Sequence, residues 1–261
     1  MTNLSISTIQ TNLFWEDKAA NLEMLETKIQ TLDKAEVVVL PEMFSTGFSM
    51  QPHKFAEPMN GLTITWMQEV AARKKIILTG SMMAEDGGKY FNRLVWMLPT
   101  GQFGYYDKRH LFAYAGEHEH YSPGNRRLVA QVKGWRILLL TCYDLRFPVW
   151  SRQQLKNQTP EFDAIIYVAN WPDRRSLAWR TLLQARAIEN QCYVIGVNRV
   201  GNDGNGLYHS GFTSVIDPLG EILYQQKDAE VIATHLLDIE KLNDIREKIP
   251  FWKDGDHFQI S

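Results

Sequence analysis

The sequence has little of what marks secreted, membrane-spanning or nucleic-acid-binding proteins. It contains only two cysteines, Cys142 and Cys192, which are too few for a disulfide framework. No apolar run approaches the roughly 20 residues that span a bilayer. The formal net charge is -2 and the basic residues are scattered, so no electrostatic footprint for nucleic acid exists. The amino terminus also lacks a basic segment followed by an apolar core. These absences predict a cytoplasmic protein with no membrane or nucleic-acid partner.

The composition is that of an ordinary globular protein. Apolar residues make up 44% of the chain and charged residues 22%. The 261 residues are long enough for one large α/β domain, and no repeat, linker or low-complexity segment divides them. We therefore expect a single domain over residues 1–261, with a carboxyl-terminal arm from about residue 239.

The hydrophobic pattern predicts a sheet covered by helices. Residues 4–10 alternate apolar and polar side chains like a strand, and residues 17–32 carry apolar side chains at helical spacing. A short apolar strand follows at residues 37–40. The same order of helix and buried strand returns at 63–74 and 76–78, which favours β-α-β units.

Later segments continue this pattern and then turn antiparallel. Residues 175–190 form a predicted helix with Leu177, Leu183 and Ile188 among its core-facing side chains. Residues 113–125 have no usable periodicity, and we interpret them as a loop over a site. The remaining predicted elements are a hairpin at 91–98 and 103–106, buried strands at 137–140, 164–168 and 192–197, antiparallel strands at 211–216, 222–224 and 231–237, and a last helix at 239–248.

One buried strand ends abruptly in a cysteine. Cys142 follows the apolar run 137–140 closely, and Pro148 suits the first turn of a following helix. Cys142 is therefore expected on a strand-to-helix turn, where backbone amides and the helix dipole stabilise a thiolate and lower the thiol pKa. The alternative is a buried cysteine that acts as a small hydrophobic residue.

Two other polar residues, Glu42 and Lys108, also follow predicted strands. A thiol nucleophile needs a base, and a carboxylate in a partly desolvated pocket has a raised pKa suited to that role. A lysine beside both groups favours the thiolate and stabilises the oxyanion that forms when sulfur attacks a carbonyl. The backbone N–H of Tyr143 is a natural second oxyanion donor.

The stretches around these three residues, 41–44, 107–112 and 141–148, resemble in order and spacing the catalytic motifs of the nitrilase superfamily of carbon-nitrogen hydrolases. The resemblance covers essentially the whole chain. It implies a four-layer α-β-β-α sandwich, a covalent thioester intermediate, no cofactor, and assembly into a homodimer or higher homo-oligomer. The other matching stretches are 121–124, 169–172, 210–214 and 217–220.

The resemblance also assigns roles to individual residues. It makes Cys142 the nucleophile, Glu42 the general base and Lys108 the cation that stabilises the oxyanion. Family members keep a second glutamate near the lysine that helps to position the substrate. Glu117 is expected to be that residue, with Glu119 as the alternative.

The residues after the cysteine indicate a branch of the superfamily. Nitrile-hydrolysing members typically have Trp-Glu after the cysteine, whereas Tyr143-Asp144 here resembles the amidase branch that includes omega-amidases. The loop 116–120 resembles that of bacterial omega-amidases. This implies hydrolysis, by water, of the terminal amide of 2-oxoglutaramate or 2-oxosuccinamate to the dicarboxylate and ammonia. The alternatives are a general aliphatic amidase, a carbamoylase, and a catalytically silent interaction module of the same fold.

A substrate of this kind has a carboxylate at its far end, so the pocket needs a cation or several N–H donors. Phe44 and Trp171 are expected as apolar walls, with ordinary core packing as the alternative for both. Arg146 has an alternative role as an ion-pair partner of Asp144. The candidate cations near motif ends are Arg109, Arg146, Arg174, Arg175 and Arg199.

The histidines of the chain suggest two other chemistries. His118 and His120, with the neighbouring glutamates, suggest a metal cluster, but the zinc spacing His-Glu-x-x-His is absent and no further cluster completes a shell. No metal is therefore expected. His110 is the alternative base of a Cys-His hydrolase, although no Asn or Asp that orients it can be identified by spacing.

Overall fold

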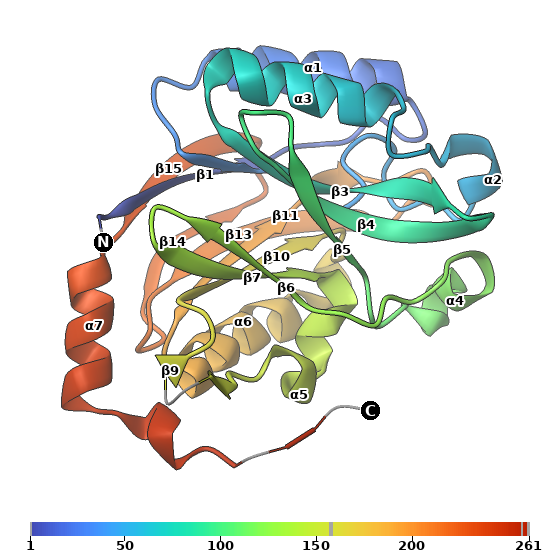
Figure 1. Cartoon of the computed structure of the whole chain (residues 1–261). Coiled ribbons are helices and arrows are strands. Elements are labelled where there is room, and N and C mark those ends of the chain that lie inside the picture. The colour runs from blue at the N-terminus through green and yellow to red at the C-terminus, as the bar shows by residue number, and fades with distance from the viewer. Residues whose placement is uncertain (1, 157–158, 257, 260–261) are drawn as a thin grey trace.

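The computed structural model describes residues 2–156, 159–256 and 258–259, and these form two β-sheets that pack face to face with helices outside (Figure 1). This confirms the predicted α-β-β-α sandwich. The first sheet has the order β15 (Val231–Leu237), β1 (Leu4–Gln10), β2 (Val37–Val39), β3 (Ile77–Asp86), β4 (Lys89–Met97) and β5 (Phe103–Asp107).

The second sheet runs through the other half of the chain. Its β14 (Ile222–Lys227) pairs with β13 (Tyr208–Ile216). The strands β8 (Leu155–Lys156) and β9 (Thr159–Pro160) form a separate small hairpin. The strands of the second sheet are, in order, β12 (Val200–Asn202), β13 (Tyr208–Ile216), β11 (Tyr193–Asn198), β10 (Ala164–Ala169), β7 (Trp135–Thr141) and β6 (Leu128–Val132), with β14 at Ile222–Lys227.

Helices cover the outer faces of both sheets (Figure 1). The helices α1 (Lys18–Gln30) and α3 (Leu62–Lys74) lie on the first sheet, and α6 (Ser176–Asn190) covers the second. Among the described residues, no helix is both long enough and apolar enough to cross a bilayer. The shorter helices are α2 (Pro52–Phe55), α4 (Glu117–His120), α5 (Pro148–Ser151) and α7 (Ile239–Lys248), with 3₁₀ turns η1 (Ala113–Ala115), η2 (Cys142–Arg146), η3 (Asp173–Arg175) and η4 (Phe251–Asp254).

Parallel strands at the centre of each sheet bring the candidate residues together. The strands β1, β2 and β3 are parallel, as are β7, β10 and β11. Parallel neighbours place their carboxyl ends on one edge of the sheet, and ligands bind there in open α/β sheets. Glu42 follows β2, Cys142 follows β7, and Asn170 follows β10.

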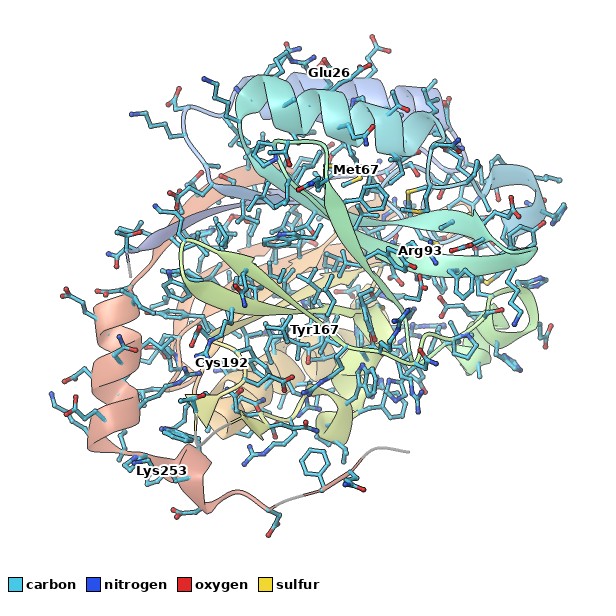
Figure 2. All side chains as sticks on the ribbon, in the orientation of Figure 1. Glu26, Met67, Arg93, Tyr167, Cys192 and Lys253 are labelled. Carbon is cyan, nitrogen blue, oxygen red and sulfur yellow. The ribbon has the colours of Figure 1, made fainter. Side chains whose placement is uncertain are left out.

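Apolar side chains fill the space between the two sheets and the space under the helices (Figure 2). Tyr167 on β10 and Cys192 before β11 have no exposed surface. Gly196 on β11 permits the close approach of α6, because an added Cβ there would lie 2.5 Å from Leu183 Cδ1. Burying a large apolar side chain contributes roughly 1.5–3 kcal/mol, so this interior is the main source of stability.

Two expectations for the helices need correction. Leu183 is buried in α6, as are Trp179, Arg186, Ala187 and Asn190, whereas Leu177 and Ile188 are 74% and 54% exposed. The exposed pair lies outside the stripe that faces β11 and β13. The expected arm from residue 239 begins with α7, whose Leu242 is fully buried, so this part of the arm is packed against the body.

Candidate active site

Cys142 begins the turn η2 directly after β7 and has a φ of 45°. Met43, next to Glu42, also has a left-handed φ, of 43°. Such backbone costs of order 1–3 kcal/mol for a residue other than glycine, and it persists only where the surroundings impose it. The strained backbone therefore lies at Cys142 itself and next to Glu42, two of the three expected catalytic residues.

Glu42, Lys108 and Glu117 form a cluster with no exposed surface. Lys108 Nζ lies 2.9 Å from Glu42 Oε1 and 2.9 Å from Glu117 Oε2. Cys142 is 9% exposed, and its thiol lies close enough to Glu42 and Lys108 for both charges to act on its pKa. The structure thus brings together a thiol, a base and a cation from three separate strand ends, and adds Glu117 as the fourth group.

Two asparagines that sequence reasoning missed hold the glutamates. Asn92 Nδ2, on β4, donates to Glu42 Oε1 at 2.8 Å and to Glu117 Oε1 at 3.1 Å. The backbone N–H of Asn170 donates to Glu42 Oε2 at 2.7 Å. The stretch 169–172, which contains Asn170, resembles a family motif, but a single Asn within a strand gives no comparable signal for Asn92.

The electrostatics of the cluster overturn the expected thiolate. Burial, and then the negative charge of Glu42, raise the pKa of the Cys142 thiol well above its usual range, and Lys108 only partly opposes them. Burial alone would lower the pKa of Lys108, but Glu117 and then Glu42 raise it overall. These surroundings therefore favour the neutral thiol, and Glu42 is the neighbouring carboxylate that can take its proton.

Glu117 rather than Glu119 reaches the cluster. Glu117 is buried at the start of α4, while His118, Glu119 and His120 on the same short helix are exposed. Burial raises the pKa of Glu117, and Lys108 opposes that rise. Because Glu117 is buried and the other three side chains are exposed, these four residues do not form a metal site. Among the described residues, no group of three or more His, Cys, Asp or Glu side chains could hold a metal ion.

His110 does have an acidic partner, although spacing did not reveal it. Its Nδ1 lies 2.8 Å from Asp144 Oδ1, and its ring stacks on Phe147 with the centroids 3.8 Å apart. His110 borders a separate surface hollow with Phe147 and Trp150, and it does not line the cavity at Cys142. The geometry thus argues against His110 as the base, and Asp144 is not the partner of Arg146.

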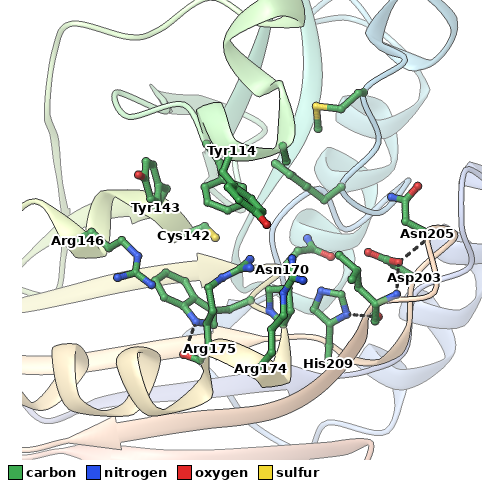
Figure 3. Close-up of a pocket in the computed structure, with 17 residues that line it drawn as sticks. Tyr114, Cys142, Tyr143, Arg146, Asn170, Arg174, Arg175, Asp203, Asn205 and His209 are labelled. Atoms are coloured by element: carbon green, nitrogen blue, oxygen red, sulfur yellow. Dashed lines mark hydrogen bonds between the residues drawn. The ribbon is translucent and has the colours of Figure 1, made fainter.

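A cavity of about 350 Å³ opens at Cys142 (Figure 3). Tyr143 and Trp171 line it, as expected, but Phe44 does not. Phe44 is fully buried under α3, where its ring centroid lies 5.9 Å from that of Trp66. Its position after β2 turns the ring into the core, so the expectation of a wall at Phe44 was wrong.

Three of the five candidate arginines, Arg146, Arg174 and Arg175, line this cavity. Their guanidinium groups lie 5.0–5.9 Å from aromatic ring centroids, and within the described part of the chain none has a carboxylate within 4 Å. Figure 3 shows Tyr114 opposite Arg174 and Arg175. The cavity therefore presents three guanidinium groups without direct ion-pair partners, and Asp203 is a carboxylate elsewhere in its lining.

The other two candidate arginines lie elsewhere. Arg199 is fully buried and donates to Asn12 Oδ1 at 2.7 Å and to the Asn202 carbonyl at 2.9 Å, so it supports loops behind the cavity. Arg109 lies against Trp150, beside the hollow that His110 borders. Neither lines the cavity at Cys142.

His209, at the far end of the cavity, gives a pH-dependent stability. Burial and then Arg199 lower the pKa of His209 from 6.5 to about 4, and its Nδ1 donates to the Leu207 carbonyl at 2.9 Å. The folded protein binds this proton more weakly than the unfolded chain. The free energy of unfolding therefore decreases as the pH falls from 6.5 to about 4, by up to about 3 kcal/mol from this group.

His209→Asn is expected to lose less unfolding free energy than the wild type between pH 6.5 and about pH 4. Urea unfolding at the two pH values measures the difference. The exposed His118→Asn is the control and should decline like the wild type. Equal declines for His209→Asn and the wild type would contradict the assignment.

Comparisons with known proteins agree with this geometry. A family model described as carbon-nitrogen hydrolase matches residues 5–247. The omega-amidase YafV of Escherichia coli (strain K12) is 43% identical over 100% of both chains, and the 2-oxoglutaramate amidase of Bacillus subtilis (strain 168) is 30% identical over 96% of each. A solved CN-hydrolase superfamily protein from Xanthomonas campestris, with an arsenic adduct in its active site, is 42% identical, with a TM-score of 0.97 over 100% of both chains. The chain belongs to the carbon-nitrogen hydrolase family.

Proposed function

We propose that this chain is an omega-amidase that hydrolyses the terminal amide of 2-oxoglutaramate or 2-oxosuccinamate to the dicarboxylate and ammonia. One observation carries the proposal: a thiol beside a buried Glu42–Lys108 ion pair opens into a cavity lined by three arginines without carboxylate partners. The full-length relatives named omega-amidase and 2-oxoglutaramate amidase support it.

In the first half-reaction, Cys142 Sγ attacks the amide carbon while Glu42 takes the thiol proton. Because the pKa of the thiol is raised, proton removal must accompany the attack. Lys108 Nζ and the backbone N–H of Tyr143 stabilise the oxyanion, since amides in the first turn of a helix have no acceptor within it. The C–N bond then breaks, and Glu42 returns the proton to the departing ammonia.

In the second half-reaction, water hydrolyses the thioester. Glu42 removes a proton from water, the resulting hydroxide attacks the thioester carbon, and the C–S bond breaks. The sulfur recovers a proton from Glu42, and the carboxylic acid leaves. Glu117 also pairs with the Lys108 ammonium, which keeps Lys108 in place beside Glu42 through both steps.

The arginines provide the charge that a keto-acid monoamide needs at its far end. Burial and then the neighbouring Arg174 lower the pKa of Arg175, so an anion placed between them relieves unfavourable charge. Guanidinium groups bind carboxylates through paired hydrogen bonds. The cavity therefore favours an acidic amide over a neutral amide or nitrile.

Arg175→Gln is expected to raise the KM for 2-oxoglutaramate on the order of 30-fold, because a charge-assisted contact contributes about 2 kcal/mol. Its kcat/KM for a neutral amide such as propionamide should stay within about 2-fold of the wild type. Arg73→Gln, at an exposed ion pair on α3, is the control. A uniform loss on both substrates would argue against carboxylate recognition.

One assay separates the alternatives. Ammonia release is measured across 2-oxoglutaramate, 2-oxosuccinamate, glutamine, a carbamoyl amino acid and a simple nitrile. The proposal expects the two keto-acid amides to give the highest kcat/KM. A preference for the carbamoyl compound or for neutral amides would replace it by a carbamoylase or a general amidase, and no turnover would favour the silent module.

The proposal extends to assembly and compartment. The chain forms a homodimer or larger homo-oligomer, and the exposed apolar side chains of Val149 on α5 and of Leu177 and Ile188 on α6 support this. Sedimentation velocity tests it, and a monomer at micromolar concentration would contradict it. Both cysteines are free thiols, which suits a reducing cytoplasm.

A further inference from the structure

We infer that Asp144 is a positioning residue that fixes Cys142 and Lys108 relative to each other, with Tyr106 and His110 as its partners. The inference rests on the proposed function and deepens it. Asp144 is fully buried, and within the described ranges no lysine or arginine lies within 4 Å of its carboxylate. Among the described residues, His110 is the one ion-pair partner of Asp144.

Both oxygens of Asp144 accept hydrogen bonds from the segments that carry the reacting groups. Oδ2 accepts from the backbone N–H of Thr141, just before Cys142, at 3.0 Å. Oδ1 accepts from the backbone N–H of His110, two residues after Lys108, at 3.0 Å. One carboxylate therefore joins the strand end that carries the nucleophile to the loop that carries the cation.

Tyr106 and the His110 side chain complete this hydrogen-bonded connection between the two segments. Tyr106 OH donates to Asp144 Oδ2 at 2.7 Å and accepts from the backbone N–H of Arg109 at 3.0 Å and from Trp150 Nε1 at 3.0 Å. His110 Nδ1 donates to Oδ1 at 2.8 Å. The backbone N–H of Thr141, before Cys142, and those of Arg109 and His110, after Lys108, are thus held by Asp144 and Tyr106.

The His110–Asp144 pair is arranged as a clamp. In a Cys-His hydrolase such a pair orients the base toward the nucleophile. Here the His110 ring contacts Phe147 and Trp150 at a separate surface hollow, and it does not line the cavity at Cys142. Misplacing a catalytic group by about 1 Å can cost 100-fold in rate, so a clamp between these two segments acts on catalysis.

Asp144→Asn tests the inference, because it keeps the size of the side chain but replaces one acceptor oxygen with a donor. The kcat for 2-oxoglutaramate is expected to fall about 10- to 100-fold while the KM changes less than about 2-fold. The rate of Cys142 alkylation by iodoacetamide should fall in parallel. That rate requires no turnover.

The matched control is Asp163→Asn, a second buried carboxylate, which binds Arg136 and Arg246 and does not line the cavity. It should lower the melting temperature but leave kcat and the alkylation rate near wild type. If Asp144→Asn behaves in the same way, the inference is overturned. Tyr106→Phe, which removes only the phenol oxygen, should give a milder loss of kcat and carries the test if Asp144→Asn does not fold.

A pair of His110 variants separates positioning from packing. His110→Asn retains an amide N–H that can donate to Asp144 Oδ1, whereas His110→Phe keeps the stacking on Phe147 and donates nothing. The Asn variant should keep a kcat closer to wild type, and the reverse order would overturn the inference. Should wild type not hydrolyse 2-oxoglutaramate while Asp144→Asn still slows alkylation, the proposed function fails and the positioning role stands.

Discussion

Cys142→Ala should abolish ammonia release from 2-oxoglutaramate, lowering kcat by at least about 10⁴-fold, because no other group can form the thioester. The fold should remain cooperative, since the substitution removes one sulfur atom beside an existing cavity. Ammonia release and thermal unfolding measure the two effects. The raised thiol pKa also predicts that wild-type activity depends on Glu42 to remove the proton.

Cys192→Ala is the matched control for this variant. Cys192 is the other free cysteine, is fully buried, and does not line the cavity. It should lose about 1 kcal/mol of stability from the lost sulfur and retain turnover. Mass spectrometry of wild type that is quenched with acid during turnover should also reveal an acyl group on Cys142. Turnover near wild type in Cys142→Ala would refute its role as the nucleophile.

Lys108→Met is the second large effect, because it removes the cation from between two buried carboxylates. Among the described residues, Lys108 is the sole basic group within 4 Å of Glu42 or Glu117. Breaking a buried ion pair on one side costs about 3–5 kcal/mol. Loss of the oxyanion contact should also lower kcat on the order of 1000-fold. Urea unfolding and ammonia release measure these losses.

The pH dependence of this variant follows from the carboxylates left behind. Glu117 already has a raised pKa in the folded protein, and loss of Lys108 removes the charge that opposes this rise. A carboxyl group whose folded pKa exceeds its unfolded pKa stabilises the fold below the unfolded value and loses that contribution as the pH rises. Lys108→Met should therefore be more stable in mild acid than at neutral pH.

Adding Glu117→Gln to Lys108→Met is the control for this interpretation. The double variant should recover part of the lost stability, because one uncompensated carboxylate is gone, but it should not recover turnover. Full activity of Lys108→Met, or an unchanged stability in both variants, would contradict the assigned role of the cluster.

The sequence allowed much of this site to be predicted because its groups follow strand ends. Glu42 and Cys142 come after apolar runs, and parallel strands place such ends on one edge of a sheet. Asn92 could not be found in this way, since a single polar residue within β4 has no spacing that distinguishes it. Its contacts depend on Glu42 and Glu117, which reach it from other parts of the chain.

The other wrong predictions concern properties that tertiary contacts determine and local sequence does not specify. The predicted thiolate relied on the turn after β7, but burial and the charge of Glu42, brought from another sheet, dominate the thiol pKa. Phe44 lies within the stretch 41–44, two residues after Glu42, yet its ring packs in the core. Helical spacing likewise does not show which side of α6 faces β11. The prediction that Leu177 and Ile188 face the core is therefore wrong, because both are exposed.

The contrast between the two cysteines has a practical consequence. Cys142 opens into a cavity and Cys192 has no exposed surface, so a small alkylating amide reaches only one thiol in the folded chain. The mass gained on labelling then counts functional centres directly, one per intact chain. A preparation can thus be titrated for its competent fraction before any substrate has been identified.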